Sequence, residues 1–379
     1  MLKHIVFFVP CSNYDAIAYF TAQLSEALSN EGVTCETIDL TKRRITDVIA
    51  YLRNKKPDCT FTFNPILPLP DGSQLCDILQ IPHVTILLDV LANHLFLSDS
   101  PYAIVGSIDS YICEILKRRN FTKTFHFPLA TRHDLPSPQE DHRCYDVTML
   151  GTCIDCEGIQ KTWQEKHTGK LCKAIDSVIN ATLSDNETSY LEIAMTQLYP
   201  FKDIDHHRLY AEILQYLKGY DRIRVVKAIK DADIHIFGTS TDKRGWKYYL
   251  DTQNNITLHG PVSYETSLAI MSKSKIVIDS SPGFKKGPHD RILTGLASGA
   301  MILTGDTHYI RNNFTENMGI TTYDHEKLGI LNEKVSALLN DTKTRIHAVS
   351  KGREFVKKKH TWKNRCNTMH NILPGLSKS

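Results

Sequence analysis

Short apolar runs alternate with segments of helical periodicity along the first third of the chain. A nearly continuous apolar run of about four to eight residues is typical of a strand buried on both faces, and apolar spacing of three and four is typical of a helix. Strands are predicted within 3–10, 33–40, 59–65 and 83–89, helices within 16–32 and 45–58, and a strand, a turn and a helix within 103–121. Strands separated by helices predict a parallel sheet with helices on both faces.

A polar stretch at 130–146 interrupts this alternation. It contains two prolines and has no hydrophobic period, so we interpret it as a linker. The pattern resumes after it with a strand at 146–151, followed by mainly helical spacing over 157–230. Further strands are predicted within 232–238, 256–259, 275–279, 300–305 and 321–324, helices from Ser263 and over 290–298, and basic helices over 326–370.

Composition narrows the class of protein. The 379 residues are enough for two domains, and 41% hydrophobic with 23% charged residues is typical of globular chains. A net charge of +3 is too small to indicate nucleic-acid binding. The ten cysteines are scattered, and the CxxC pair at 153–156 is a weak metal signal, so we favour free thiols and no metal site.

No predicted segment has the length of a membrane helix. The apolar start reaches Pro10 too soon for a signal peptide, and Asp89, Asn93 and His94 interrupt the apolar run at 84–97. We therefore expect a cytoplasmic protein. The basic C-terminal helix is open to two interpretations: a peripheral membrane contact, or a solvated face with the apolar side chains turned inward, which we favour. Those side chains are Phe355, Trp362 and Met369.

The stretch SSPGFKKGPHDRILTGLASGAMILTG at 280–305 carries the strongest chemical signal. It predicts a glycine-containing loop after a strand, then a helix with one apolar face, then another strand. Helix N-termini attract phosphate, and the loop adds cationic or titratable side chains. These are Lys285, Lys286, His289 and Arg291. The stretch therefore predicts an anion site, although neither a Walker A loop nor GxGxxG is present. The alternative is a surface loop with solvated lysines.

Two more glycine turns follow predicted strands, at Gly238 and Gly260. The carboxyl ends of parallel strands lie at one edge of a sheet, where ligands of open α/β sheets bind. Several such turns at one edge favour a nucleotide site.

The order of these elements resembles a known family. The segments DVTMLG, ADIHIFG, ITLHGPVSYETSLAIMSKSKIVIDSSPG and HDRILTGLASGAMILTG resemble the C-terminal half of CgeB-like glycosyltransferases. KPDCTFTFNP, IPHVTILLDV and KKHTWKNR are similar to parts of the same group, so the resemblance covers most of the chain. It implies an α/β protein of the GT-B fold, with two Rossmann-like domains facing a cleft. The implied divisions are an acceptor domain at 1–140, a donor domain at 145–340, and a C-terminal helix at 341–379 that crosses back.

The resemblance also implies an activity and a donor site. The chain would be a hexosyltransferase-type glycosyltransferase with a nucleotide-sugar donor, foremost a UDP-sugar, and a glycan, lipid or protein acceptor. No metal or further cofactor is implied, since basic groups and helix dipoles would hold the diphosphate. The implied donor-binding residues are Thr152, next to Gly151, with Gly238, Lys243, Gly260, Ser263, Gly287, His289, Asp290, Arg291 and Thr294. Many relatives carry Glu in an R-x-x-E pattern where this chain has Thr294, which is a weaker acceptor.

An inverting transferase needs a general base near the acceptor. Asp89 is our first candidate because it follows an otherwise apolar strand, and Asp15 and His94 are the others. Helix capping is the structural alternative for both aspartates. A retaining enzyme could lack a protein base, so the stereochemistry stays open.

Two other functions remain open at this point. A sugar-nucleotide epimerase can share the fold, and so can a catalytically inactive protein that binds nucleotide sugars. Thr294 favours the inactive protein, and the fold alone does not separate the three.

Overall fold

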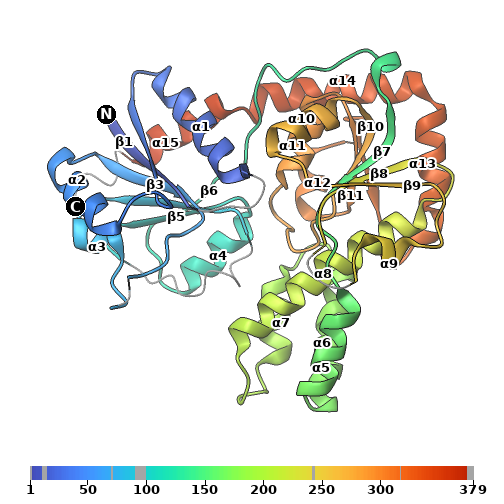
Figure 1. Ribbon diagram of the computed structural model, residues 1–379, viewed down its shortest axis with the longest axis horizontal. Coiled ribbons are helices and arrows are strands. Elements are labelled where there is room, and N and C mark those ends of the chain that lie inside the picture. Colours follow the sequence, from blue (N-terminus) through green and yellow to red (C-terminus); the bar gives the residue numbers. More distant parts are fainter. Residues whose placement is uncertain are drawn as a thin grey trace. The chain divides into compact units, whose positions relative to one another are not determined.

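The computed structural model describes residues 2–10, 15–69, 71–89, 100–240, 244–315 and 317–373. The chain divides into two compact units (Figure 1). We call Met1–His133 with Lys359–Ser379 the N-terminal unit, and Asp134–Lys358 the C-terminal unit.

The described part of the N-terminal unit contains a six-stranded parallel sheet in the order β2-β1-β3-β4-β5-β6. Its strands are β1 (His4–Val9), β2 (Thr34–Asp39), β3 (Cys59–Phe63), β4 (His83–Leu87), β5 (Ala103–Ser107) and β6 (Thr124–His126). Its helices are α1 (Ala16–Ser29), α2 (Ile45–Lys55), α3 (Leu75–Leu79), α4 (Ser110–Arg118) and α15 (Trp362–Ile372).

Aromatic packing joins α15 to this sheet. The Trp362 ring lies 5.9 Å from the Phe20 ring of α1 and 6.1 Å from the Phe63 ring of β3. Trp362 and Met369 are buried, and Phe355 is half-buried, as expected for the apolar side of a basic helical segment. Burial of such large rings is a major source of stability for the N-terminal unit.

The C-terminal unit contains a second parallel sheet, in the order β12-β11-β10-β7-β8-β9. Its strands are β7 (Tyr145–Leu150), β8 (Ile234–Phe237), β9 (Ile256–His259), β10 (Ser274–Ile278), β11 (Met301–Gly305) and β12 (Ile320–Tyr323). Between and after them lie α5 (Cys156–Lys166), α6 (Gly169–Ser184), α7 (Tyr190–Leu198), α8 (His206–Ala228), α9 (Trp246–Leu250), α10 (Tyr264–Ser272), α11 (Asp290–Ala297), α12 (His308–Asn313), α13 (Leu331–Asn340) and α14 (Thr342–Lys359), with short 3₁₀ turns at Glu140–His142 and Leu328–Ile330.

Helices α5 to α8 form an extension between β7 and β8, and in Figure 1 α5, α6 and α7 point away from the sheet. Helix α6 begins after Thr168, which caps it, and packs along α7. The Trp163 Nε1 of α5 donates to Glu212 of α8 at 3.0 Å. Helix α8 runs back from this extension and brings its last turns to the sheet.

The stretch that we interpreted as a linker is held in the C-terminal unit by two arginines. Arg143 is buried and its Nη1 donates to the carbonyls of Ser272 at 2.9 Å and Ser274 at 2.7 Å. Arg353 of α14 donates to the Leu135 carbonyl at 3.1 Å. Arg143 of this stretch therefore satisfies carbonyl groups at the end of α10 and the start of β10.

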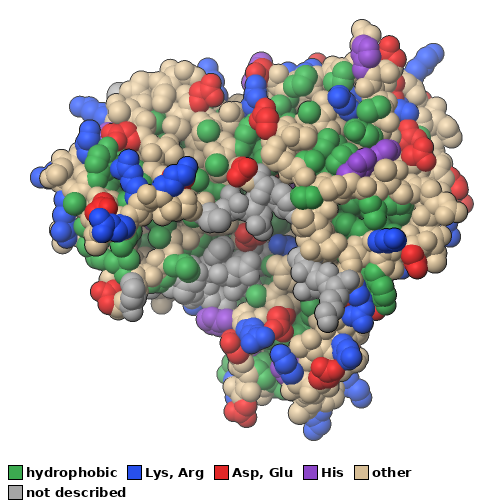
Figure 2. All heavy atoms as spheres, viewed as in Figure 1, with side chains coloured by type: hydrophobic (Ala, Val, Ile, Leu, Met, Phe, Trp, Pro, Cys, Tyr) green, Lys and Arg blue, Asp and Glu red, His purple; other side chains and the backbone are tan. Residues whose placement is uncertain are grey.

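The strands predicted from the sequence are present in the structure, and both sheets are parallel as expected. The short helices α3, α9 and α12 and the three-residue β6 were not separated from their surroundings by pattern. Within the described ranges, no helix is both long and apolar enough to cross a membrane. Figure 2 shows acidic and basic side chains interspersed on the visible face.

Candidate functional site

The order of strands in the C-terminal sheet reverses between β7 and β10. From β7 the chain proceeds to β8 and β9 on one side, and from β10 to β11 and β12 on the other. At such a switch point the loops leave the carboxyl ends of adjacent strands in opposite directions, which makes room for a ligand. The residues that follow β7 are Gly151 and Thr152, and those that follow β10 are Asp279 and Ser280.

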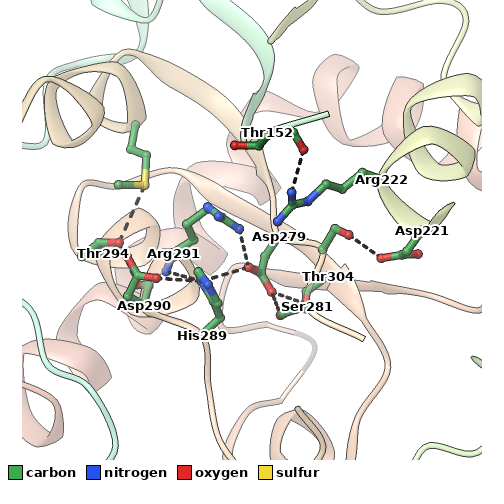
Figure 3. A network of polar contacts seen from close by, with 12 residues as sticks. Thr152, Asp221, Arg222, Asp279, Ser281, His289, Asp290, Arg291, Thr294 and Thr304 are labelled. Atoms are coloured by element: carbon green, nitrogen blue, oxygen red, sulfur yellow. Dashed lines mark hydrogen bonds and ion pairs between the residues drawn. The ribbon is translucent and has the colours of Figure 1, made fainter. Parts of the chain in front are cut away.

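Asp279 is the centre of a buried polar network at this point (Figure 3). Its carboxylate accepts hydrogen bonds from Thr304 Oγ1 at 3.2 Å and from the Ser281 hydroxyl. Arg291 Nη1 lies 3.2 Å from the same carboxylate and forms an ion pair with it. These contacts fix the start of the glycine loop and satisfy a carboxylate that would be costly to bury alone.

Helix α11 points its N-terminus at Asp279. His289 occupies the N-cap position, with Nδ1 2.7 Å from Asp290 and 3.4 Å from Asp279. The Arg291 amide lies 3.4 Å from the same nitrogen, at the N-terminal cap of α11. The helix dipole places partial positive charge at this N-terminus, which favours an anion.

Asp290 is buried at the first position of α11. Burial by itself would raise its pKa, but the His289 and Arg291 charges and a 2.9 Å hydrogen bond from the Tyr264 hydroxyl hold the pKa of Asp290 well below its usual range. Asp290 is therefore an ionised carboxylate that ties α11 to α10. Its contacts indicate a structural anchor for His289.

A second buried carboxylate, Asp221 of α8, holds the other side of the loop. It accepts from Ser280 Oγ at 2.6 Å and from Tyr323 Oη at 2.8 Å, and His325 Nδ1 lies 3.0 Å from it. Burial raises its pKa, but the His325 contact and the two hydroxyls outweigh burial and keep the pKa of Asp221 below the usual value. Two successive serines are thus held by carboxylates from different elements.

Arg222, the next residue of α8, lies on the β7 side of the switch point (Figure 3). Its Nη1 donates to the Thr152 carbonyl at 2.7 Å. A Cβ at Gly151 would lie 3.3 Å from the guanidinium carbon, so glycine leaves space for this side chain. Burial and the Arg291 charge lower the pKa of Arg222 to about 10. It remains a cation at neutral pH.

Gly238 allows the loops after β7 and β8 to meet. A Cβ there would lie 2.0 Å from the Gly151 carbonyl oxygen, which no side chain can tolerate. The Cys153 amide donates to the Thr239 carbonyl at 2.8 Å, and Trp246 Nε1 donates to the Gly151 carbonyl at 3.2 Å. The two loops therefore form one surface beside the switch point.

The structure brings several of the sequence-predicted donor residues together. Thr152, His289, Asp290 and Arg291 share the network of Figure 3, with Gly238 beside it. Gly287 lines a small cavity under the loop. Lys243 lies outside the described residues.

The predicted turn after β9 leads into α10, whose first residue, Tyr264, donates to Asp290 of this network. Ser263 caps α10 by accepting from the Thr266 amide at 3.2 Å, as the sequence predicted. Gly260 is exposed, and a Cβ there would contact nothing within 4 Å. The turn is open to solvent in the C-terminal unit.

Two side chains of the loop and its helix differ from the expectation. Lys285 is buried and donates to the Thr182 carbonyl of α6 at 3.0 Å, so its charge is engaged by the helical extension. Thr294 is buried as well, and its hydroxyl donates to the Asp290 carbonyl at 2.7 Å. The hydroxyl that was expected to replace a ribose-binding carboxylate therefore bonds to its own helix.

The catalytic candidates belong to the N-terminal unit. Asp89 follows β4, and its carboxylate accepts from Asn64 Nδ2 at 3.2 Å. Asn64 also accepts from the Leu88 amide at 2.9 Å, and its backbone has a φ of 60°. Asp15 is exposed, precedes α1, and makes no side-chain capping bond. His94 lies outside the described residues.

The CxxC thiols do not form a metal site in the described structure. Cys153 and Cys156 are buried, and burial raises the pKa of each to about 12. Both are therefore protonated at neutral pH. Among the described residues, no group of three or more His, Cys, Asp or Glu side chains could hold a metal ion.

Sequence reasoning missed Asp279, Asp221 and Arg222. Asp279 had been assigned only as the end of a strand, and Asp221 and Arg222 lay within a long helical pattern. The available signal was a pair of adjacent charges in a helix whose neighbouring positions, such as Leu217 and Val225, are buried. Such a pair in a buried segment needs partners, which here lie at the ends of β7 and β10.

Comparisons with known proteins concern the sequence region and the fold. Residues 222–371 match the family model described as glycosyl transferase-like, so the matched region begins at Arg222 and includes Asp279 and Arg291. The match covers less than half of the chain. No curated protein sequence matches at a significant level.

Solved structures share the fold over nearly the whole chain. Sucrose-phosphate synthase from Thermosynechococcus elongatus is 12% identical, with a TM-score of 0.60 and 99% of each chain covered. Anabaena HepE, in complex with UDP and glucose, is 9% identical, with a TM-score of 0.56, covering 98% of this chain and 100% of HepE. T4 phage BGT, in complex with UDP and Mn²⁺, is 12% identical, with a TM-score of 0.57, and the match covers 98% of this chain and 99% of BGT. The chain has the GT-B fold, with two Rossmann-like domains.

Proposed function

We propose that this chain is a glycosyltransferase that moves a sugar from a nucleotide diphosphate donor to a glycan, lipid or protein acceptor. The carrying observation is the α11 N-terminus at the switch point of the C-terminal sheet, with the Arg291 guanidinium held beside it by Asp279. Two Rossmann-like units and a glycosyl transferase-like region support the same class. The narrower likeness to CgeB-like enzymes is part of this proposal.

In the proposed reaction, the bond between the anomeric carbon and the diphosphate oxygen breaks. The electron pair leaves with the nucleoside diphosphate, and the acceptor oxygen bonds to the anomeric carbon. Arg291 and the first turn of α11 stabilise the charge that develops on the leaving diphosphate, because they are positioned before the reaction begins. We propose a UDP-sugar as the donor, supported by the UDP in the HepE and BGT structures.

The acceptor oxygen must also lose a proton. We propose Asp89 as the general base of an inverting reaction, because its carboxylate is oriented by Asn64. Asp15 and His94 are the alternatives. We further propose that the reaction needs no metal, since cationic side chains and a helix dipole stand where the diphosphate would lie.

The test is to incubate the purified protein with UDP-, GDP-, TDP- and CMP-sugars, with and without EDTA, and to follow nucleotide release and thermal shift together. We expect one donor to raise the melting temperature and to be hydrolysed slowly, equally in EDTA. Loss of both effects in Arg291→Ala would place the site. If none of the donors raises the melting temperature, the proposal is contradicted. Loss of activity in EDTA would contradict metal independence.

The second candidate is a protein that binds nucleotide sugars without consuming them. Thr294 favours it, because this side chain is buried and its hydroxyl bonds to the Asp290 carbonyl. A thermal shift without release of nucleotide, even with a panel of acceptors, would support this candidate. An isomerised sugar without release would instead indicate an epimerase.

A further inference from the structure

Arg222 has no role in the proposed function so far, although it lies at the same switch point. Its guanidinium comes from α8 and reaches the carboxyl end of β7, where it donates to the Thr152 carbonyl at 2.7 Å. Arg291 comes from α11 and lies at the end of β10. Because β7 and β10 are neighbours, the two guanidinium groups approach the switch point from opposite sides.

The two guanidinium groups repel each other. Their repulsion adds to the burial that lowers the pKa of Arg222, and Asp279 and Asp221 only partly offset it. An anion placed between the two groups would relieve this repulsion. Arg222 as a whole residue is half-buried.

The donor capacity of Arg222 exceeds what its neighbours use. A guanidinium has five N–H donors, and the structure describes one hydrogen bond for Arg222, to the Thr152 carbonyl. The loop after β7 provides no other basic side chain between 151 and 160. Arg222 of α8 supplies a cation beside the Thr152 carbonyl at the end of β7, and Gly151 leaves the space for it.

We propose that Arg222 is a second cationic contact for the leaving diphosphate, opposite Arg291. The inference rests on the proposed function, because it concerns the same site. Arg222 would stabilise charge on the leaving group from the β7 side, while the first turn of α11 and Arg291 act from the β10 side. A guanidinium suits this role because it presents paired donors to phosphate oxygens.

The alternative is that Arg222 only pins the turn after β7 through the Thr152 carbonyl. Two substitutions separate the roles. Arg222→Gln removes the charge but keeps N–H donors for the carbonyl, whereas Arg222→Lys keeps the charge. Arg208→Gln is the matched control, because Arg208 is an exposed arginine in the first turn of the same helix, paired with Glu212.

The experiment measures the affinity of UDP by calorimetry and the melting temperature for the full-length wild type and the three variants. We expect Arg222→Gln to weaken UDP binding about 10- to 100-fold, the effect of losing a charged hydrogen bond. Arg222→Lys should recover most of the affinity, and Arg208→Gln should bind like the wild type.

Two results would overturn the inference. One is Arg222→Gln binding UDP like the wild type. The other is an equal loss of affinity in Arg222→Gln and Arg222→Lys with lowered melting temperatures, which would indicate a structural role. If Arg222→Gln does not fold, the Lys variant decides alone: retained affinity supports the inference and lost affinity overturns it. Failure of the wild type to bind any nucleoside diphosphate would contradict the proposed function itself. This outcome is distinguishable from failure of the Arg222 inference, in which the wild type binds UDP.

Discussion

The two sheets have the same parallel winding but differ in what lies where their strand order reverses. In the N-terminal unit the strand order reverses between β1 and β3. The first residue after β3 is Asn64, whose side chain accepts from the Leu88 amide and donates to Asp89. In the C-terminal unit it falls between β7 and β10, where Asp279 is buried among charged partners. The winding provides a place for a ligand, and the side chains decide which ligand it suits.

The interiors differ in a related way. In the N-terminal sheet, aromatic rings pack together on β1 and β3. The ring centre of Phe61 lies 5.2 Å from that of Phe7 and 5.0 Å from that of Phe63. Burial lowers the pKa of His83 and His360 in the N-terminal unit and that of His259 in the C-terminal unit. Among the described carboxylates, however, only Asp221 and Asp290 of the C-terminal unit are buried with a lowered pKa. This contrast leads to the largest of the expected effects.

Acid should destabilise the N-terminal unit at a higher pH than the C-terminal unit. Burial lowers the pKa of His83 to about 4, and burial with the Arg365 charge lowers that of His360 to about 3. A histidine in the unfolded chain has a pKa near 6.5. As the pH falls from about 6.5 to about 4, protons therefore bind the unfolded unit more tightly than the folded one. For His83 alone this lowers the free energy of unfolding by about 3 kcal/mol. Asp221 and Asp290 have lowered pKa values, so their contribution is complete above about pH 4 and is lost only below it.

Tryptophan fluorescence can follow each unit during denaturant unfolding between pH 7 and pH 4. Trp362 belongs to the N-terminal unit, and Trp163 and Trp246 belong to the other. Trp362→Phe and the double variant Trp163→Phe, Trp246→Phe therefore report on one unit each. Parallel loss of stability in both units would contradict the prediction, and His83→Gln should reduce the loss in the N-terminal unit.

Arg291→Ala should weaken nucleoside diphosphate binding about 100-fold, because a charge-assisted contact at a helix N-terminus is lost. Calorimetry with UDP measures the effect. Arg311→Ala is the control, since Arg311 is a half-exposed arginine of the same unit paired with Asp306 at 2.6 Å. Binding within threefold of the wild type in Arg291→Ala would exclude the α11 N-terminus as the diphosphate site.

Gly238→Ala should lower the free energy of unfolding of the C-terminal unit by about 1 to 3 kcal/mol, the usual cost of overpacking. The new Cβ would meet the Gly151 carbonyl oxygen at 2.0 Å, and backbone must move to admit it. Gly260→Ala is the matched control, because its Cβ would contact nothing within 4 Å. Denaturant unfolding measures both, and equal stability of the two variants would contradict the close approach of the loops.

Asn64→Gly should give the smallest effect, a loss of sugar transfer of about tenfold without a change in UDP affinity. Glycine tolerates the φ of 60° at this position, so the variant removes the contact to Asp89 with little backbone strain. Asn120→Gly is the control, because Asn120 has a φ of 65° and lies on the surface after α4. A parallel fall in UDP affinity would show that Asn64 does not act through the acceptor side.

The parts of the fold that follow from local chemistry could be predicted from the sequence. Ser263 caps α10, as the pattern indicated. Helix α11 buries the expected Ile292, Leu293 and Leu296, but it is buried on its other sides as well, with Arg291 as its one residue that is not buried. The short helix α9 could not be found because five residues give too little periodicity.

The site was predictable only where neighbouring residues in the sequence create it. His289 and Arg291 belong to one loop and helix, so their proximity follows from the chain. Asp221 and Ser280 are 59 residues apart, and Arg222 and Thr152 are 70 apart, so only the tertiary fold brings these pairs together. Lys285 and Lys286 look alike in the sequence, yet α6 provides a carbonyl for the first of them.

Helix α8 contributes Asp221 and Arg222 about two turns before its end, after about 23 Å of continuous helix that starts in the extension. Each added residue would rotate everything beyond it by about 100° and shift it by about 1.5 Å. A single insertion in α8 before Asp221 would therefore turn Asp221 away from Ser280 and Arg222 away from Thr152. During divergence of such chains, length changes can accumulate in the connections between α5, α6 and α7, while the final turns of α8 must keep their register.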